Sequence, residues 1–283
     1  METAETTKGL ITEHLTAFVE RMGSQNKAAT ALKISNGTVS QIMNRNWDLI
    51  SEEMWRGIAA HLRLNKKEWA SVETRDYKML TQLLTDAQDN SNVFAITGEA
   101  GTGKSHTIRL YTESHKRVYA IQCADFWNRK IFLQELLSSM GRDHSGLNVN
   151  DMMNEVVRTL KSQDRPLIIL DEADKLVDPV MYFFITLYNR LEDHCGIILI
   201  ATDHLAKRIM AGLRKNRKGY KEIYSRIARR FIEMTGPSTS DIMAICMANG
   251  IQDQQQIRKV MEDSDSDLRR VNRKIHSLLA QAN

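Results

Sequence analysis

A glycine-rich segment constrains the fold of this chain more than any other part of its sequence. Residues 98–105 read Gly-Glu-Ala-Gly-Thr-Gly-Lys-Ser, which fits the pattern G-x-x-x-x-G-K-[ST] at every fixed position. Residues 93–97 before it read as a buried strand, and residues 106–115 after it can continue as a helix. Glycines let the backbone wrap closely around phosphate groups, so that N–H groups and the helix start point at the anion. The segment therefore predicts a phosphate-binding loop in an α/β core.

The same segment supplies candidate ligands for a nucleotide and its metal ion. Lys104 would reach the β- and γ-phosphates of ATP, and the Ser105 hydroxyl would help to hold Mg²⁺. The predicted ATP-binding set consists of Gly98, Glu99, Ala100, Gly101, Thr102, Gly103, Lys104, Ser105 and His106.

Two carboxylates follow a second apolar run. Residues 167–170 read Leu-Ile-Ile-Leu and lead into Asp171 and Glu172, 67 residues after Lys104. Ligands bind at the carboxyl ends of strands in parallel sheets, so we expect Asp171 to bind Mg²⁺ through water. Glu172 would orient or deprotonate the attacking water. The complete set predicts ATP hydrolysis and argues against an interaction scaffold with a vestigial loop.

The middle of the chain alternates strands with helices. Candidate strands cover residues 93–97, 118–122, 167–170 and 196–201, and candidate helices cover 128–140, 151–161 and 178–192. This alternation predicts a parallel sheet with helices on both faces. A helical stretch at 72–89 leads into the core, and the flanking parts are helical throughout. The predicted organisation is an all-α domain at 1–70, an α/β core at 71–236 and a helical lid at 237–283.

The first part of the chain resembles a helix-turn-helix of the phage-repressor type. Two short helices, one ending near residue 32 and one beginning near residue 37, are joined by a tight turn, and Val39 and Ile42 would face the core. The side chains then available to a major groove are Asn36, Thr38, Ser40 and Gln41. A helical bundle for protein contacts is the alternative, because residues 1–88 carry eleven basic and eleven acidic side chains, whereas nucleic-acid modules are usually basic.

The net charge of +4 conceals a basic segment. Residues 203–230 contain ten Lys or Arg and only two acids, with little aromatic interleaving. This composition favours phosphate contact without base readout, and a solvated face or a subunit interface is the alternative. The candidate DNA-binding residues are Lys207, Arg208, Arg214, Lys215, Arg217, Lys218 and Lys221.

Composition also excludes several classes of protein. The three cysteines lie far apart and form no C-x-x-C pair, which argues against a zinc site or a disulfide framework and suits a reducing cytosol. The first residues are polar and acidic, and no apolar run approaches the roughly 20 residues that span a bilayer. We therefore expect a cytoplasmic protein that is not associated with a membrane.

Taken together, these motifs resemble the AAA+ ATPases. In that family a polar residue ends the strand after the acidic motif and helps to position water, and residues 196–201 here lead into Thr202 and Asp203. The resemblance leaves open which of the two serves. The letters Asp-Glu-Ala-Asp at 171–174 also occur in DEAD-box helicases, but only 109 residues follow, too few for a second nucleotide-contacting domain.

The resemblance also implies two arginines at the site. AAA+ proteins offer an arginine finger to the γ-phosphate of the neighbouring subunit, and Ser-Arg-Ile-Ala-Arg-Arg at 225–230 resembles that box. Arg226 is the expected finger, with Arg229 and Arg230 as alternatives. In the last helix, Asp-Leu-Arg-Arg at 267–270 resembles the lid arginine that senses phosphate, and Arg269 is the expected residue. An arginine supplied in trans implies that hydrolysis depends on oligomerisation.

The order of helix-turn-helix, AAA+ core, basic segment and short lid resembles the B proteins of Mu-type transposing phages, the MuB family. That family implies an ATP-dependent, largely non-specific DNA-binding ATPase that forms helical filaments on duplex DNA. It implies double-stranded DNA, a DDE transposase and further copies of the chain as partners, with delivery of target DNA and stimulation of strand transfer. A helicase loader of the AAA+ class and an ATP-switched transcriptional regulator are the alternatives.

Overall fold

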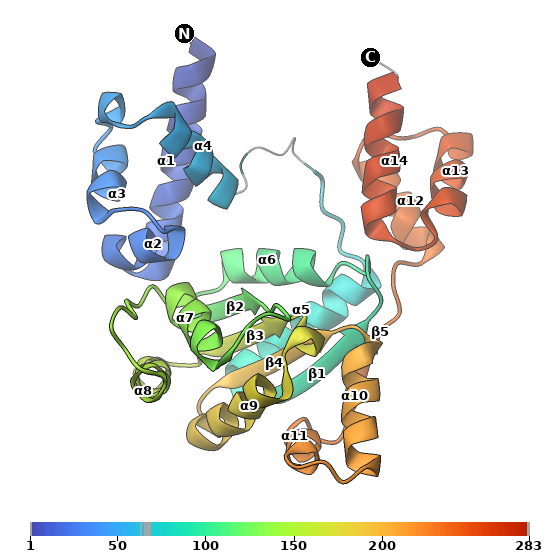
Figure 1. Cartoon of the computed structure of the whole chain (residues 1–283). Coiled ribbons are helices and arrows are strands. Elements are labelled where there is room, and N and C mark those ends of the chain that lie inside the picture. Colours follow the sequence, from blue (N-terminus) through green and yellow to red (C-terminus); the bar gives the residue numbers. More distant parts are fainter. Residues whose placement is uncertain (1, 63, 65–68, 282–283) are drawn as a thin grey trace.

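The computed structural model describes residues 2–62, 64 and 69–281. Its elements fall into an N-terminal helical part, an α/β core and a C-terminal helical part (Figure 1). The N-terminal elements are α1 (Glu2–Met22), α2 (Gln25–Leu32), α3 (Asn36–Met43), the 3-10 turn η1 (Trp47–Leu49) and α4 (Glu52–His61). The C-terminal helices, which form the predicted lid, are α12 (Thr239–Ala248), α13 (Gln254–Ser264) and α14 (Leu268–Gln281).

The core lies between these two helical parts in the sequence. Its strands are β1 (Val93–Gly98), β2 (Val118–Gln122), β3 (Leu167–Asp171), β4 (Gly196–Ala201) and β5 (Phe231–Met234). Its helices are α5 (Arg75–Asn90), α6 (Lys104–Ser114), α7 (Arg129–Ser139), α8 (Val149–Lys161), η2 (Ala173–Lys175), α9 (Asp178–Leu191), α10 (Asp203–Arg214) and α11 (Tyr220–Arg226).

Serine caps determine where the N-terminal helices begin. The hydroxyls of Ser24, Ser35 and Ser51 each accept the backbone N–H three residues ahead, at 3.0–3.2 Å. A serine in this position satisfies a backbone donor that the first helical turn leaves unpaired. The predicted helices are therefore present, with α3 starting one residue earlier than expected because Ser35 caps it.

The sheet is parallel and its strand order is β2-β3-β4-β1-β5. All four predicted strands are present, and β2 and β4 have the predicted bounds. The edge strand β5, which pairs with β1, was not predicted. It has four residues and follows the arginine-rich segment directly, so no long apolar run marks it in the sequence.

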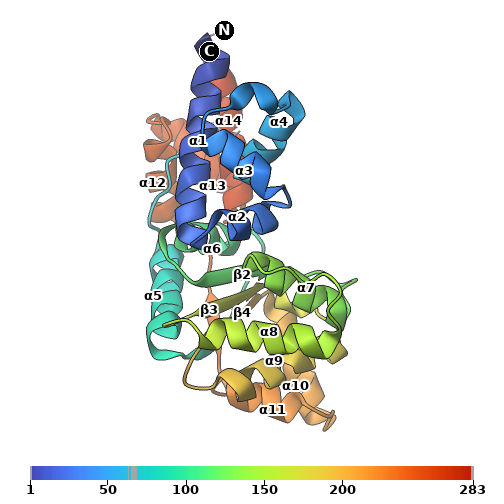
Figure 2. The same cartoon turned by 90° about the vertical axis from the view of Figure 1, so that its left-hand side faces the viewer.

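Alternate residues of the central strands face opposite layers of helices. Ile168 and Leu170 of β3 pack in the cluster with α7, α8 and α9, whereas Leu167 and Ile169 pack in the cluster with α5 and α6. Strands buried on both faces become continuous apolar runs, which is why periodicity alone did not distinguish their faces. The predicted α/β class, a parallel sheet with helices on both faces, is confirmed (Figure 2).

The segment before α5 lies along the lid. Trp69 and Val72 pack on the hydrophobic cluster of α12–α14, and Ala70 exchanges two hydrogen bonds of 3.0 Å with the side chain of Asn249. These contacts hold residues 69–73 against the lid, outside any regular secondary structure. The helix predicted over 72–89 therefore begins only at Arg75, where Thr74 caps it.

The N-terminal helices rest on the core through α2. Gly141, which follows α7, has a φ of +62°, and a Cβ there would lie 2.6 Å from the Cα of Lys27 in α2. Each of the three parts has its own hydrophobic cluster, which supports the division near residues 70 and 236 that we propose. No helix within the described ranges is both long and apolar enough to cross a membrane.

Gly196→Ala tests the packing of α5 on the sheet. A Cβ at Gly196, the first residue of β4, would lie 2.2 Å from the carbonyl oxygen of Ala87 in α5. Because a backbone atom cannot turn away, we expect the variant to lose about 1–3 kcal/mol of unfolding free energy in urea titrations. Gly57→Ala in α4 is the control, since no atom other than those of its chain neighbours and its own helix backbone lies within 4 Å of the added Cβ. It should gain about 0.5–1 kcal/mol; equal stability of wild type and Gly196→Ala would contradict the described packing.

Candidate functional site

The glycine-rich loop, residues 98–103, joins β1 to α6 at the carboxyl edge of the sheet. Gly101 and Gly103 have φ values of +86° and +97°, which only glycine adopts without cost. A cleft of about 430 Å³ lies over the loop, between the segment before α5 and the lid. The predicted ATP-binding residues from Gly101 to His106 line this cleft, and Gly98, Glu99 and Ala100 form the first half of the loop.

Lys104 is held inside the curve of the loop. Its Nζ donates to the carbonyl oxygens of Gly98 and Glu99, both at 2.6 Å. Burial lowers the pKa of the ammonium group, and the charge of Asp171 opposes that shift. A cation in this position is placed to compensate the charge of a phosphate group bound in the loop.

Ser105 and Asp171 form an oxygen-rich pair beside the loop. The Ser105 Oγ donates to the Asp171 Oδ2 at 2.7 Å, and Asp171 is only 6% exposed. Burial raises the pKa of Asp171, although hydrogen bonds from Ser105 and from the backbone of Glu172 oppose this. Hydroxyl and carboxylate oxygens suit Mg²⁺, which takes few protein ligands and keeps water and phosphate oxygens as the others. Among the described residues, no group of three or more His, Cys, Asp or Glu is arranged to hold a metal ion.

Glu172 is held as an ionised carboxylate at the end of β3. Its Oε2 accepts from Gln122 Nε2 at 3.1 Å and from Lys175 Nζ at 2.6 Å. Burial opposes ionisation, but these two hydrogen bonds outweigh it and lower the pKa of Glu172. The residue also has a φ of +57°, an uncommon backbone conformation outside glycine. A fixed carboxylate of this kind can orient a water molecule.

Sequence reasoning missed Gln122. It ends β2 and pairs in register with Asp171, so the parallel sheet brings it beside Glu172. The signal in the sequence is a polar residue at the end of a strand. We used that signal to choose Thr202 after β4, but not to choose Gln122 at the end of β2.

The structure separates the two candidates that follow β4. Thr202 Oγ1 donates to Asp174 Oδ2 at 2.7 Å and so faces the segment after β3. Asp203 instead forms an ion pair with Lys207 one turn along α10, which lowers the pKa of its carboxyl group. Thr202 is therefore our choice for the polar residue at the strand end.

The lid contacts the glycine-rich loop at the start of α14. The Leu268 N–H donates to the Gly101 carbonyl at 2.9 Å, and a Cβ at Gly101 would lie 2.1 Å from Asp267 Oδ1. Arg269 lines the cleft, and its charge contributes, after burial, to the lowered pKa of Lys104. The structure thus brings the predicted lid arginine to the predicted ATP site.

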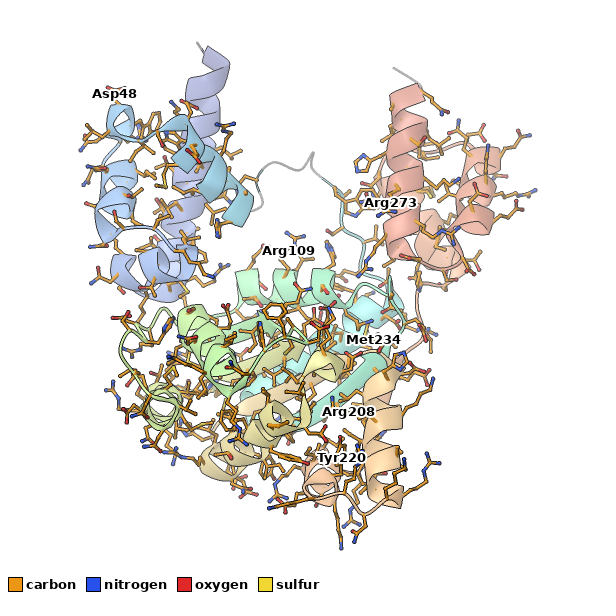
Figure 3. All side chains as sticks on the ribbon, in the orientation of Figure 1. Asp48, Arg109, Arg208, Tyr220, Met234 and Arg273 are labelled. Carbon is orange, nitrogen blue, oxygen red and sulfur yellow. The ribbon has the colours of Figure 1, made fainter. Side chains whose placement is uncertain are left out.

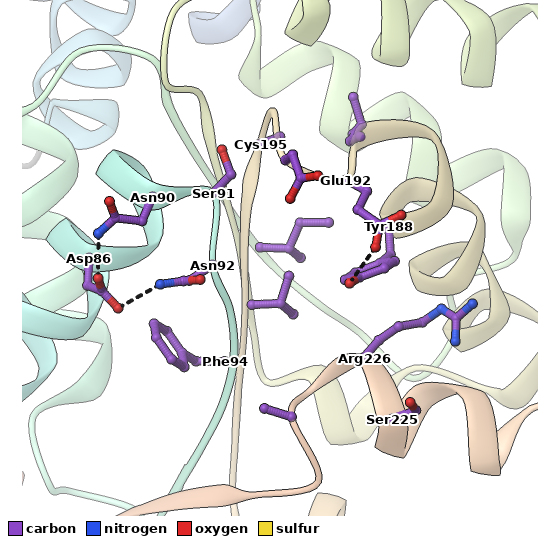
Figure 4. Close-up of a pocket in the computed structure, with 15 residues that line it drawn as sticks. Asp86, Asn90, Ser91, Asn92, Phe94, Tyr188, Glu192, Cys195, Ser225 and Arg226 are labelled. Atoms are coloured by element: carbon purple, nitrogen blue, oxygen red, sulfur yellow. Dashed lines mark hydrogen bonds between the residues drawn. The ribbon is translucent and has the colours of Figure 1, made fainter.

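Arg226 lies away from the glycine-rich loop, beside the amino ends of β1 and β4. Its guanidinium donates twice to Asn189 Oδ1, at 2.9 and 3.1 Å, and stacks 5.3 Å from the ring centroid of Tyr188. It lines a hollow of about 400 Å³ (Figure 4). The six residues of β1 span roughly 20 Å between this edge and the loop. Arg226 therefore does not reach the loop of its own chain.

One predicted DNA contact is corrected by the structure. Arg208 is bound internally: it donates to the carbonyls of Asp174 and Leu176 and forms an ion pair with Asp178. Sequence shows its charge but not these partners, and we remove it from the DNA-binding set. Lys207 is exposed and paired with Asp203. The exposed basic residues around the turn between α10 and α11 are Arg214, Lys215, Arg217, Lys218 and Lys221.

The helix-turn-helix candidates lie on α3. Val39 and Ile42 are fully buried, as expected, and Asn36 is exposed. Thr38, Ser40 and Gln41 are half-buried. In both views α3 and the α10–α11 turn lie at opposite ends of the molecule (Figures 1 and 2). They are two separate candidate surfaces.

Asp171→Asn tests the cost of the buried charge. Because the folded-state pKa of Asp171 is raised, its ionisation disfavours the folded state, and stability is lost as pH rises from the unfolded pKa through the folded pKa. Without nucleotide, the unfolding free energy of the wild type should therefore fall relative to that of Asp171→Asn as pH rises above about 4, the ordinary pKa range of an aspartate. Urea titrations at several pH values measure this difference.

Asp143→Asn is the matched control for that experiment. The backbone N–H and the hydroxyl of Ser145 lower the pKa of this exposed carboxyl, so its stabilising contribution grows as pH rises. The unfolding free energy of the wild type should therefore rise relative to that of Asp143→Asn as pH rises, opposite to the change expected for Asp171→Asn. A pH-independent difference for Asp171→Asn would contradict the assigned burial.

A family model and a relative in sequence agree with this geometry. Residues 52–209, more than half of the chain, match the family model described as an AAA domain. The chain is 22% identical over 247 residues to the Mu-like prophage FluMu DNA transposition protein B of Haemophilus influenzae, covering 84% of each chain. A solved structure of Drosophila ORC bound to DNA aligns with a TM-score of 0.42 and 14% identity, over 69% of this chain and 50% of that chain. This chain thus spans half the length of that structure's chain. The chain belongs to the AAA domain family and is a MuB-like AAA+ ATPase.

Proposed function

We propose that this ATPase binds duplex DNA as an ATP-dependent oligomer and presents that DNA to a DDE transposase. The observation that carries the proposal is the position of Arg226. It lies near the amino ends of the parallel strands, while the predicted ATP site lies at their carboxyl ends. That site contains Lys104, Ser105, Asp171 and Glu172. A second copy of the chain can supply the missing arginine, so that hydrolysis requires assembly.

Each residue of the site has a chemical role in this proposal. The loop N–H groups and Lys104 hold the phosphates, and Arg269 contacts them from the lid. Ser105 and Asp171 hold Mg²⁺, which would neutralise charge on the phosphate oxygens. Glu172 orients the attacking water. The Thr202 hydroxyl keeps Asp174 turned toward β4, which supports the segment that carries Glu172.

The trans arginine supplies the largest single effect. In comparable phosphoryl-transfer enzymes an arginine that stabilises the developing charge accelerates hydrolysis about 10³–10⁵-fold. Asn189 and Tyr188 hold Arg226 in a fixed direction, so that little side-chain entropy is lost when a neighbour docks. An isolated subunit should hydrolyse ATP slowly.

DNA binding is assigned to the basic turn between α10 and α11. Its exposed side chains suit contact with phosphates, which gives affinity without sequence preference. The same helix α11 ends at Arg226, so subunit contact and DNA contact involve one short segment. The side chains of α3 form a second surface, for DNA or for a protein partner.

The proposed role in transposition is supported by the relative. That protein is named as a DNA transposition protein B, and the similarity extends over the N-terminal helices or the lid as well as the core, since it covers 84% of this chain. Delivery of target DNA and stimulation of strand transfer follow as the proposed activities. A sequence-specific footprint at low protein concentration would instead favour an ATP-switched regulator.

Two variants distinguish ATP binding from the contribution of Arg226 by a neighbouring subunit. Lys104→Ala should abolish ATP binding and ATP-dependent DNA binding, because the phosphates lose their main cation. Arg226→Ala should keep ATP affinity but lose about 10³-fold or more of the DNA-stimulated hydrolysis rate. Fluorescent-nucleotide titration and phosphate release measure these effects, and electron microscopy with duplex DNA should show filaments only when ATP is added.

Arg229→Ala is the control for the finger assignment. Arg229 is exposed, three residues beyond Arg226, and should keep at least about half of the wild-type rate. Full DNA-stimulated hydrolysis by Arg226→Ala, or DNA binding that does not respond to ATP, would refute the proposal.

The salt dependence of DNA binding tests the basic turn. Neutralising one phosphate contact, as in Lys215→Ala or Lys218→Ala, should reduce the slope of log K against log salt by about 1, equally for all duplex sequences. Gln41→Ala on α3 should leave this slope unchanged. Fluorescence anisotropy at several salt concentrations measures it, and unchanged slopes for both lysine variants would rule out the turn as the DNA surface.

A further inference from the structure

Arg208 joins four segments of the core. From α10 its guanidinium donates to the Leu176 carbonyl at 2.5 Å and the Asp174 carbonyl at 3.2 Å. It also forms the ion pair with Asp178 at the start of α9, and its Nε donates to the Tyr220 hydroxyl at 3.1 Å. Figure 3 shows Arg208 and Tyr220 near each other where α10 and α11 meet. The ATP site and the DNA surface proposed above do not use this cluster.

On one side, the cluster reaches the segment that carries the catalytic carboxylate. Asp174 lies in η2, which begins directly after Glu172, and Leu176 is the residue that follows η2. Lys175 in the same turn binds the Glu172 carboxylate, and Thr202 holds the Asp174 side chain. A movement of this turn therefore changes both the position of Glu172 and the acceptors of Arg208.

On the other side, the cluster reaches the helix that ends at the arginine finger. Tyr220 is the first residue of α11 and is 1% exposed. Its hydroxyl donates to Asp178 Oδ1 at 2.7 Å, and its ring leaves no room for a side chain at Gly212, where a Cβ would lie 2.4 Å away. Because α11 has only seven residues, a displacement at Tyr220 is passed along one short helix to Arg226.

We propose that Arg208 is a positioning residue that couples the ATP site of its own subunit to the arginine finger which that subunit lends to its neighbour. The inference rests on the proposed trans role of Arg226. Its chemical basis is the planar guanidinium, whose five N–H donors can serve four acceptors at once. A lysine in the same place keeps the positive charge but cannot hold all of these acceptors together.

A mixing experiment assigns the effect of Arg208 to one of the two roles of a subunit. Glu172→Gln subunits keep Arg226 but cannot hydrolyse ATP, and serve as finger donors. Arg226→Ala subunits keep the ATP site but lack the finger, and serve as site donors. Neither hydrolyses ATP efficiently alone, and a mixture of the two on duplex DNA should do so.

Arg208→Lys is then introduced into one partner at a time. In the finger donor it should lower the mixture's rate at least about tenfold, since a misplacement of about 1 Å can cost about 10²-fold. In the site donor it should change the rate by less than about twofold, because Gln122 of β2 and Lys175 hold Glu172 without contact to Arg208, and the affinity for a fluorescent ATP analogue should stay unchanged. Tyr220→Phe keeps the buried ring and removes only the hydroxyl, so it tests the same connection if Arg208→Lys folds poorly. It should show a weaker effect in the same role.

The control and the contrary outcomes are distinct. Arg190→Lys changes an exposed arginine of α9 that binds Asn154, and should leave both mixtures unaffected. A full rate with Arg208→Lys in the finger donor would overturn the inference, and so would an equal loss in both roles, which marks a general structural defect. If the unmodified pair fails to hydrolyse ATP, the trans role of Arg226 itself is wrong and the inference fails with it.

Discussion

The hydrogen bond between Ser105 and Asp171 joins two segments that lie 66 residues apart, and the ATP site depends on it. It forms because β1 and β3 are parallel and both pair with β4, so their carboxyl ends meet at one edge of the sheet. The same parallel register places Gln122 beside Asp171 and Thr202 beside Asp174. The acidic motif and the glycine-rich loop therefore act together only through the strand order.

The parallel sheet also separates the two halves of the proposed catalytic machinery. One edge carries the loop, the metal pair and Glu172, whereas the opposite edge carries Arg226 on its support of Asn189 and Tyr188. A single subunit cannot bring both edges to one nucleotide. Two copies in head-to-tail contact can bring them together, with the amino ends of the strands of one copy facing the carboxyl ends in the next. Repeating this contact gives a ring or a filament. DNA that binds several subunits at once would then favour the stacked state.

The sequence predicted the parts of the fold that have strong local signals. Apolar runs identified four of the five strands, and the tight turn near residues 33–36 separated the two short helices of the N-terminal part. The edge strand β5 was missed because four residues that follow two arginines directly give no periodic signal. The start of α5 was misplaced because Val72 packs on the lid, a contact between distant segments that local propensity does not contain.

The site residues divide in the same way, into those with a local sequence signal and those whose role depends on contacts with distant segments. Lys104 and Ser105 have fixed positions in the glycine-rich pattern, and Asp171 and Glu172 directly follow an apolar run, so local sequence was enough to propose all four. The interpretation of Arg208 was wrong because charge alone does not reveal that four acceptors surround the side chain. Gln122 was overlooked because its importance comes from the neighbouring strand, with which it pairs.

Gly101 shows how the lid limits sequence variation in the loop. The pattern G-x-x-x-x-G-K-[ST] leaves this position open to any residue. In this chain its φ is +86°, and a Cβ would meet Asp267 at 2.1 Å where α14 begins. A larger residue at position 101 would therefore need both a left-handed backbone, which is costly outside glycine, and a movement of Asp267 away from the loop. The start of a helix more than 160 residues away in the chain thus adds a second restriction at a position that the motif leaves open.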